Sequence, residues 1–294
     1  MRIYTKKIEV ISEIKRDLVE MWQPVSTYSM QNKIVEWNHD YDTKEIINYA
    51  FCLSDIDNIE DLIYYDEFKE AEQKRIDKYF ETEDVKSYIK YIKDKFNIDL
   101  KDVDDIKNKR DTLLKIWLSE DFWERIRKDI NPWEAWKIRP WVWEEFLWNK
   151  DWDIKKFDYT YSERIQVHDL LEQISQHPTS RQYVLNIWDR KDRTWVNWER
   201  RIPCSLNYQI LIRPNWERDD EGKEIQFVNL IYNMRSCDFL THFPVDIIQA
   251  VNLMKYVTKR LNTKAKSKLY FPWKLFYNCS SLHLYRKDLL ENVF

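Results

Sequence analysis

The sequence predicts an α+β domain in which strands of the second half pack against long helices. The stretches "SLNYQILIR" (205–213) and "FVNLIYNM" (227–234) alternate polar and apolar residues, as half-buried strands do. The stretch "VDIIQAVNLMKYVTKRLN" (245–262) instead repeats apolar residues at helical spacing. The chain has 294 residues, enough to bury a large core within one domain.

The other elements follow in chain order. Residues 43–130 are rich in Lys, Asp, Glu, Ile and Tyr, and "EFKEAEQKRIDKYFETEDVKSYIKYIKDKF" (67–96) has the spacing of helices with charged outer faces. The Trp-rich segment 131–152 predicts a loop and a short helix, and "RIQVHDLLEQISQH" (164–177) predicts an amphipathic helix. "RQYVLNIWD" (181–189) and "LHLYR" (282–286) predict two more strands. Within one domain, 1–294, residues 1–130 therefore form a helical N-terminal part, and residues 131–294 carry the chemistry.

Charge and cysteine usage exclude several classes of protein. The net charge is -3 and the sequence pI about 6.1, with both signs mixed along the chain, unlike the basic surface of a nucleic-acid binder. No apolar run approaches the ~20 residues of a membrane span, and the N-terminus lacks a signal-peptide core, so we expect a cytoplasmic protein. The four cysteines form no close pair for a metal site or disulfide framework, so we expect free thiols and no metal.

Glycine is almost absent. The chain has one glycine, Gly222, and fifteen tryptophans, whereas average usage predicts roughly twenty glycines. Turns that need a positive φ must therefore use Asn, Asp or strained residues. We hypothesise that some tryptophans, such as Trp22 and Trp133, mark UGA codons that the host reads as glycine; the alternative is a genuine tryptophan bias. The tryptophans that we expect to be genuine are Trp136, Trp143 and Trp188.

Cys204 is the candidate nucleophile, because it follows a proline at the start of a predicted strand. A cysteine attacks as its thiolate, so its pKa of about 8.5 must be lowered by nearby positive charge. Arg181, Arg200, Arg201 and Arg235 could supply that charge, and the same groups could bind a phosphate. On spacing alone, a buried core thiol is the commoner role of a strand cysteine.

Five motifs in four segments together resemble the thymidylate synthase superfamily. "RRIPCSLNYQILIR" (200–213) is similar to its Pro-Cys motif, "YNMRSCDFLTHFPVD" (232–246) to its Arg-Ser-x-Asp and Phe-Pro-x-Asn motifs, and "SSLHLYRKD" (280–288) to its His-x-Tyr motif. "HPTSRQYVLNIWD" (177–189) resembles its Asp-Ser-Arg-Arg segment. The resemblance covers about residues 130–290 and is greatest to divergent members from bacteriophages. It implies a mixed sheet packed by long helices and a sheet-to-sheet homodimer.

The resemblance also implies a role for each matching residue. Cys204 would add to carbon 6 of the pyrimidine of a deoxynucleoside monophosphate, and carbon 5 would then attack the methylene of the cosubstrate 5,10-methylenetetrahydrofolate. The other implied residues are Arg235 and Ser236 for phosphate, Arg181 reaching the partner's phosphate site, Asp238 for folate, His283 and Tyr285 for the deoxyribose hydroxyl, Gln209 after the nucleophile, and an active-site tyrosine at Tyr161.

Three departures from the family pattern matter. Gln182 replaces a second arginine, and Ser205 replaces the histidine after the nucleophile. Asp246 replaces the asparagine that reads uracil in thymidylate synthases, whereas the related phage deoxycytidylate hydroxymethylases carry Asp there. A carboxyl group suits the acceptor nitrogen and donor amine of cytosine. A helix N-cap is the alternative role for Asp246, and the two roles are compatible.

The motifs therefore predict a folate-dependent enzyme, most specifically a deoxycytidylate (dCMP) 5-hydroxymethyltransferase. Thymidylate synthase acting on deoxyuridylate (dUMP) is the alternative, and an inactive relative that binds nucleic acid or protein is the third reading. The family's proton-relaying glutamate is not placed, and no role is assigned to His242. The candidates for the glutamate are Glu134, Glu144 and Glu145. The residues expected to be structural are the surface histidines His39, His168 and His177 and the core thiols Cys237 and Cys279.

Overall fold

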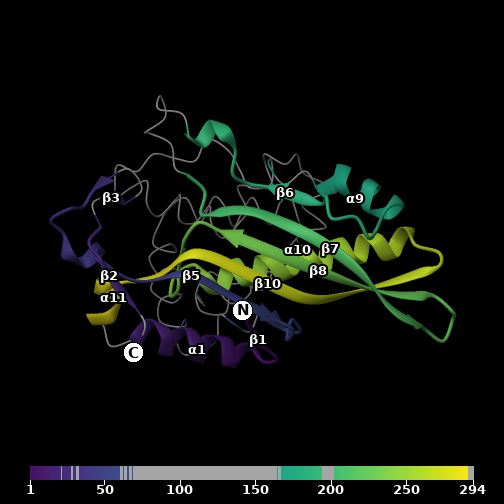
Figure 1. Ribbon diagram of the computed structural model, residues 1–294, viewed down its shortest axis with the longest axis horizontal. Helices are drawn as coiled ribbons and strands as arrows, with labels where there is room; N and C mark the ends of the chain where they lie inside the picture. Colours follow the sequence, from purple (N-terminus) through teal and green to yellow (C-terminus); the bar gives the residue numbers. More distant parts are fainter. Residues whose placement is uncertain are drawn as a thin grey trace, which may run out of the picture.

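The computed structural model describes residues 1–20, 22–27, 29–30, 33–59, 62, 65, 68, 164, 167–193 and 202–290 (Figure 1). Several sequence predictions fall outside the described residues. They concern most of the helical layer expected over 43–130, the Trp-rich segment 131–152, Tyr161 and the three candidate glutamates. Within the described ranges, no helix has the length and apolar character that a membrane span requires.

One mixed sheet organises the described chain and confirms the predicted α+β class. Its strand order is β1-β5-β10-β8-β7-β6, with β2 beside β5 and β9 beside β10. β10 runs parallel to β8 and antiparallel to β5, while β7 is antiparallel to both β8 and β6. The strands are β1 (Arg2–Tyr4), β2 (Gln23–Val25), β5 (Thr43–Leu53), β6 (Val184–Asn186), β7 (Ser205–Arg218), β8 (Glu224–Met234), β9 (Cys237–Asp238) and β10 (Lys268–Tyr285).

The helices lie against this sheet (Figure 1). The longest, α10 (Phe243–Lys264), packs on β10 and β8 and confirms the predicted long helix. α9 (Val167–Gln176) lies within the predicted helix 164–177 and contacts α10, where Lys264 Nζ is 3.0 Å from Glu172 Oε2. The remaining elements are α1 (Lys7–Glu20), α11 (Arg286–Leu290), the short 3-10 helices His39–Tyr41 and Arg190–Arg193, and the β3 (Ser29–Met30)–β4 (Lys33–Ile34) pair.

The helical expectation for the N-terminal part is wrong at residues 43–53. This segment is β5, which pairs with β10 along most of its length and lies inside the sheet. Ile46, Tyr49, Phe51 and Leu53 are buried in the core. Their aromatic and β-branched side chains favour a strand, and the neighbouring charged residues obscure that signal in the sequence.

An aromatic cluster fixes the start of α10 against the sheet. The Phe51 and Tyr277 rings stack at 5.0 Å, and Phe243 meets Tyr277 edge-on at 5.7 Å. All three side chains are almost completely buried, and each such burial contributes roughly 1.5–3 kcal/mol. Since Phe243 opens α10 and Tyr277 belongs to β10, their contact holds the N-terminal turn of the helix close to the strand.

β10 is much longer than the predicted strand 282–286, and a bulge interrupts it. Pro272 pairs with Val228 and Leu275 with Leu230, so two residues, Trp273 and Lys274, stand opposite Asn229 alone. A bulge interrupts the period-two alternation by which a strand is recognised. The Trp273 ring is crowded here, because its centroid lies only 3.5 Å from that of Phe227.

A second irregularity occurs near the tip of the β7–β8 hairpin. Pro214 pairs with Gln226 and Arg218 with Glu224, and Trp216 lies in the unpaired stretch between them with a φ of 63° and 91% of its surface exposed. Positive φ is otherwise found in the described chain at Gly222 and at Asn48 and Asn58. The two asparagines confirm that this glycine-poor chain uses Asn at left-handed positions.

Candidate functional site

Cys204 and Arg235 meet where two antiparallel strands end. Cys204 immediately precedes β7, and Arg235 immediately follows β8. The first residue of β7, Ser205, pairs with the last of β8, Met234. The Arg235 backbone N–H then donates to the Cys204 carbonyl at 2.7 Å. Strand pairing therefore brings together two residues that are 31 positions apart in the chain.

The Cys204 thiol is exposed and has two polar neighbours. Arg235 Nη2 and Ser236 Oγ each lie 3.7 Å from Cys204 Sγ. The guanidinium is held by the same loop, because its Nε and Nη2 donate to the carbonyls of Pro203 and Ile202, each at 3.5 Å. An exposed sulfur beside a fixed cation is the environment that a cysteine nucleophile requires. The buried-thiol alternative for Cys204 is therefore wrong.

The other three cysteines are buried, as expected for Cys237 and Cys279. Burial raises the pKa of the Cys279 thiol to about 12 and raises the pKa values of Cys52 and Cys237. These thiols stay protonated near neutral pH. Cys237 Sγ donates to Asp246 Oδ2 at 3.6 Å.

The pairing of β9 with β10 places Asp238 beside His283. The two residues are register partners, and Phe239 N–H donates to the His283 carbonyl at 2.9 Å. The Asp238 side chain is buried, and its Oδ1 accepts the backbone N–H groups of Leu240 at 3.1 Å and Thr241 at 3.4 Å. The predicted neighbours on this strand face do meet, since the His283 and Tyr285 rings are 5.3 Å apart.

Burial determines the protonation of this ring pair. Desolvation lowers the pKa of His283 below its usual 6.5, so the imidazole is neutral at pH 7. Desolvation, reinforced by Asp238 and Cys204, raises the pKa of Tyr285, so the phenol keeps its proton.

Asp246 lies in the first turn of α10. The helix begins at Phe243 with His242 as its N-cap residue, so an N-cap role for Asp246 is wrong. The Asp246 N–H donates to the His242 carbonyl at 2.9 Å. Its carboxylate remains favourably placed near the positive end of the helix dipole.

Two predicted residues lie elsewhere. Gln209 is five residues beyond Cys204 along β7, roughly 16 Å at ~3.3 Å per residue. Its Nε2 donates to the Arg181 carbonyl at 2.9 Å, which joins these two residues to each other. Arg181 is exposed, and its neighbour Gln182 is exposed as well.

The sequence assigns no role to His242, yet this residue lies beside the site. Its Nδ1 is 3.9 Å from Asp238 Oδ2, and it precedes Asp246 by one helical turn. The signal in the sequence is the spacing Asp238, His242, Asp246, which repeats every four residues.

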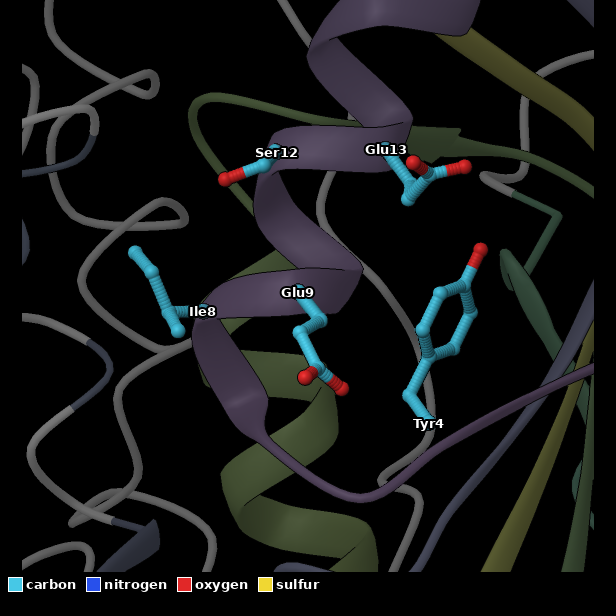
Figure 2. Close-up of a pocket in the computed structure, with 5 residues that line it drawn as sticks. All are labelled: Tyr4, Ile8, Glu9, Ser12 and Glu13. Carbon is cyan, nitrogen blue, oxygen red and sulfur yellow. The ribbon is translucent and has the colours of Figure 1, made fainter.

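A surface hollow of about 350 Å³ lies elsewhere, against α1 (Figure 2). None of its lining residues matches a motif of the predicted site, so we assign it no part in the chemistry. In the described ranges, no three His, Cys, Asp or Glu side chains are grouped to hold a metal ion. The residues that line the hollow are Tyr4 of β1 and Ile8, Glu9, Ser12 and Glu13 of α1.

Comparison with known proteins identifies the family. The family model for thymidylate synthase matches residues 84–292, well over half of the chain. The chain belongs to the thymidylate synthase family. This membership confirms the family resemblance of the motifs and makes the protein a one-carbon transferase of the folate-dependent type.

Two solved structures of thymidylate synthases are similar to this chain. The thermostable thymidylate synthase A from Bacillus subtilis has 14% sequence identity and a TM-score of 0.47, covering 98% of this chain and 82% of its own. The thymidylate synthase from T4 phage has 17% identity and a TM-score of 0.37, covering 61% of this chain and 59% of its own. No curated protein matches the sequence.

The thiol environments of this family member predict selective labelling. Iodoacetamide at pH 7.5 should alkylate Cys204 in the native protein and leave Cys52, Cys237 and Cys279 unmodified, because these three are buried with raised pKa values. Peptide mass spectrometry after a short exposure measures this, with urea-unfolded protein as the control in which all four react. Labelling of a buried cysteine at a rate equal to that of Cys204 would contradict the site geometry.

Proposed function

We propose that this protein transfers a one-carbon unit from methylenetetrahydrofolate to carbon 5 of dCMP and releases 5-hydroxymethyl-dCMP. The observation that carries the proposal is the exposed Cys204 thiol, with Arg235 Nη2 and Ser236 Oγ each 3.7 Å from its sulfur. A thiolate can add to carbon 6 of a pyrimidine, and this addition turns carbon 5 into a nucleophile.

The surrounding groups suit a deoxynucleoside monophosphate. Arg235 and Ser236 would bind the phosphate by charge-assisted hydrogen bonds while they border the thiol. His283 and Tyr285 would bind the deoxyribose hydroxyl. The neutral imidazole can donate or accept, and the protonated phenol can donate.

Asp246 is our reason for preferring cytosine. Its Oδ2 accepts the Cys237 thiol at 3.6 Å, a contact that ties the carboxyl group to β9 beside the site. A carboxyl group complements the ring nitrogen and 4-amino group of cytosine, whereas an amide complements uracil. A mismatch at such a site leaves buried polar groups unpaired, so discrimination is large.

Asp238 would hold the folate. Its Oδ1 is occupied by two backbone amides, while Oδ2 lies 3.9 Å from His242, beyond hydrogen-bond distance, and can accept an N–H of a bound heterocycle. A carboxylate acceptor complements the N–H groups of a pterin. When bound, methylenetetrahydrofolate supplies a one-carbon unit at the methylene level.

We also propose a homodimer joined through the sheet face opposite α10. Asn207, Asn233 and Asn278 form a half-buried ladder across the sheet, in which Asn233 donates to Asn207 at 2.8 Å and Asn278 donates to Asn233 at 3.0 Å. The exposed Arg181 would then serve the partner's phosphate site. Sedimentation velocity should give a dimer at micromolar concentration, and a monomer would contradict this part of the proposal.

One assay tests the reaction. Purified protein is given methylenetetrahydrofolate with dCMP or with dUMP, and both products and dihydrofolate are followed. We expect 5-hydroxymethyl-dCMP without dihydrofolate, and no turnover by Cys204→Ala. Dihydrofolate formation with dUMP would establish the alternative, thymidylate synthase. Full activity of Cys204→Ala on either nucleotide would overturn the mechanism.

A second substitution tests the choice of base. Asp246→Asn should shift the ratio of kcat/KM values for dCMP and dUMP toward dUMP by about 100-fold or more, because the amide no longer matches cytosine. Asp220→Asn, a change of an exposed carboxylate in the turn between β7 and β8, is the matched control and should leave the ratio unchanged. An unchanged ratio in Asp246→Asn would remove Asp246 from base recognition.

A further inference from the structure

His242 occupies a capping position without acting as a cap. It is the N-cap residue of α10, yet its side chain makes no capping hydrogen bond. Asp238 instead bonds the backbone amides that precede His242, because its Oδ1 accepts the N–H groups of Leu240 and Thr241. The imidazole is 30% exposed. Helix capping therefore does not account for a histidine at this position.

The imidazole lies near one carboxylate of the proposed site, and the His242 backbone is bonded to the residue that carries the other. The imidazole Nδ1 is 3.9 Å from Asp238 Oδ2, and the Asp246 N–H donates to the His242 carbonyl one turn further on. The pKa of His283, the register partner of Asp238, is lowered mainly by desolvation and to a smaller extent by His242. The side chain is therefore near the folate-binding carboxylate, on the turn that leads to the base-binding residue.

We propose that His242 is the acid–base group for the water that becomes the hydroxyl of the product. This inference rests on the proposed hydroxymethyl transfer. The other side chains of the proposed site already have roles. Cys204 is bonded to carbon 6, Asp246 binds the base, Asp238 binds the folate, and His283 binds the deoxyribose. The attacking water therefore needs a different group to take its proton. The imidazole of His242 belongs to the side-chain type that ordinarily changes protonation near neutral pH, and its Nδ1 lies 3.9 Å from the Asp238 carboxylate.

The step is balanced without an oxidant or reductant. In the Cys204 adduct, carbon 5 carries an exocyclic methylene. Water oxygen forms a bond to that methylene carbon and passes a proton to His242, while the methylene π electrons move into the ring. These electrons then re-form the carbon 5–carbon 6 double bond and expel the Cys204 thiolate. Asp238 stabilises the imidazolium that forms.

The reverse of this step gives a test that needs no folate. The protein is incubated with 5-hydroxymethyl-dCMP in ¹⁸O-water, and exchange of the hydroxymethyl oxygen is followed by mass spectrometry. Cys204 addition and loss of the hydroxyl as water form the methylene, which then captures labelled water. His242→Gln should slow exchange by roughly 100-fold or more, since glutamine cannot carry the proton. Nucleotide affinity, measured by calorimetry, should stay unchanged and so report an intact fold.

The two ways in which the test can fail are distinguishable. His177→Gln, a change at an exposed histidine that follows α9, is the matched control and should exchange at the wild-type rate. If the wild-type protein shows no exchange, the proposed hydroxymethyl transfer fails, and the role of His242 fails with it. If the wild type exchanges and His242→Gln exchanges equally fast, the role of His242 alone is overturned.

A separate observation concerns the identity of one tryptophan. Trp216 lies in the unpaired stretch of the β7–β8 hairpin, with a φ of 63° and 91% of its surface exposed. Glycine is the residue that left-handed positions favour.

We infer that the cellular protein carries glycine at position 216, through a UGA codon read as glycine. Trp22 differs, because its ring contacts Lys44 Nζ at 4.2 Å, a cation–π contact that gives the indole a role. Trp133 lies outside the described residues. Genuine tryptophans should be encoded by UGG.

The codons in the gene and the mass of the native peptides test this inference together. We expect UGA at 216, glycine in the corresponding peptide of the protein isolated from its source, and UGG at the control position Trp188. UGG at 216, or tryptophan in that native peptide, would overturn it. Recombinant Trp216→Gly should also unfold at a higher denaturant concentration than the tryptophan protein, because it removes a left-handed non-glycine residue.

Discussion

The hydrogen bond from the Arg235 N–H to the Cys204 carbonyl is the constraint on which the proposed site depends. It extends the β7–β8 pairing by one step beyond the last paired residues, Ser205 and Met234. The backbone of both residues is fixed at this point, and the guanidinium is bonded to the carbonyls of Pro203 and Ile202. The guanidinium is therefore held close to the sulfur. The charge beside the thiol is therefore a consequence of strand register.

The same strand ends organise the rest of the site. β10 runs parallel to β8, and β9 resumes the pairing after Arg235 and Ser236, so Asp238 is set against His283. The chain then turns into α10, whose first residue, Phe243, packs edge-on against Tyr277 of β10. The segment 235–246, which includes the first turn of α10, thus supplies the proposed phosphate, folate and base contacts in order. Strand pairing fixes its first residues, and the packing of Phe243 on Tyr277 fixes the helix start.

Much of this arrangement can be predicted from the sequence, and the misses have physical causes. Strands β7 and β8 alternate cleanly and α10 has a clear helical period, so all three are predicted. β5 escapes prediction because charged and amide residues flank its buried aromatics. The alternation of β10 is interrupted twice, at the Trp273 bulge and between Cys279 and Leu282, which are both buried but three residues apart. Only the part from Leu282 onward is therefore predicted. Cys204 is distinguished from a core thiol only through its neighbours, since exposure depends on where the strand ends. His242 has no motif to mark it, and only the folded chain shows its distance to Asp238.

The central claim is that Cys204 activates carbon 5 of a cytosine nucleotide, and hydrogen exchange tests it without folate. Addition of the thiolate to carbon 6 makes carbon 5 basic, so its hydrogen exchanges with solvent. In deuterium oxide, proton NMR of dCMP should show loss of the carbon 5 signal with the native protein and no loss with Cys204→Ala. Equal exchange in the two proteins, or no exchange by the native protein, would contradict this claim.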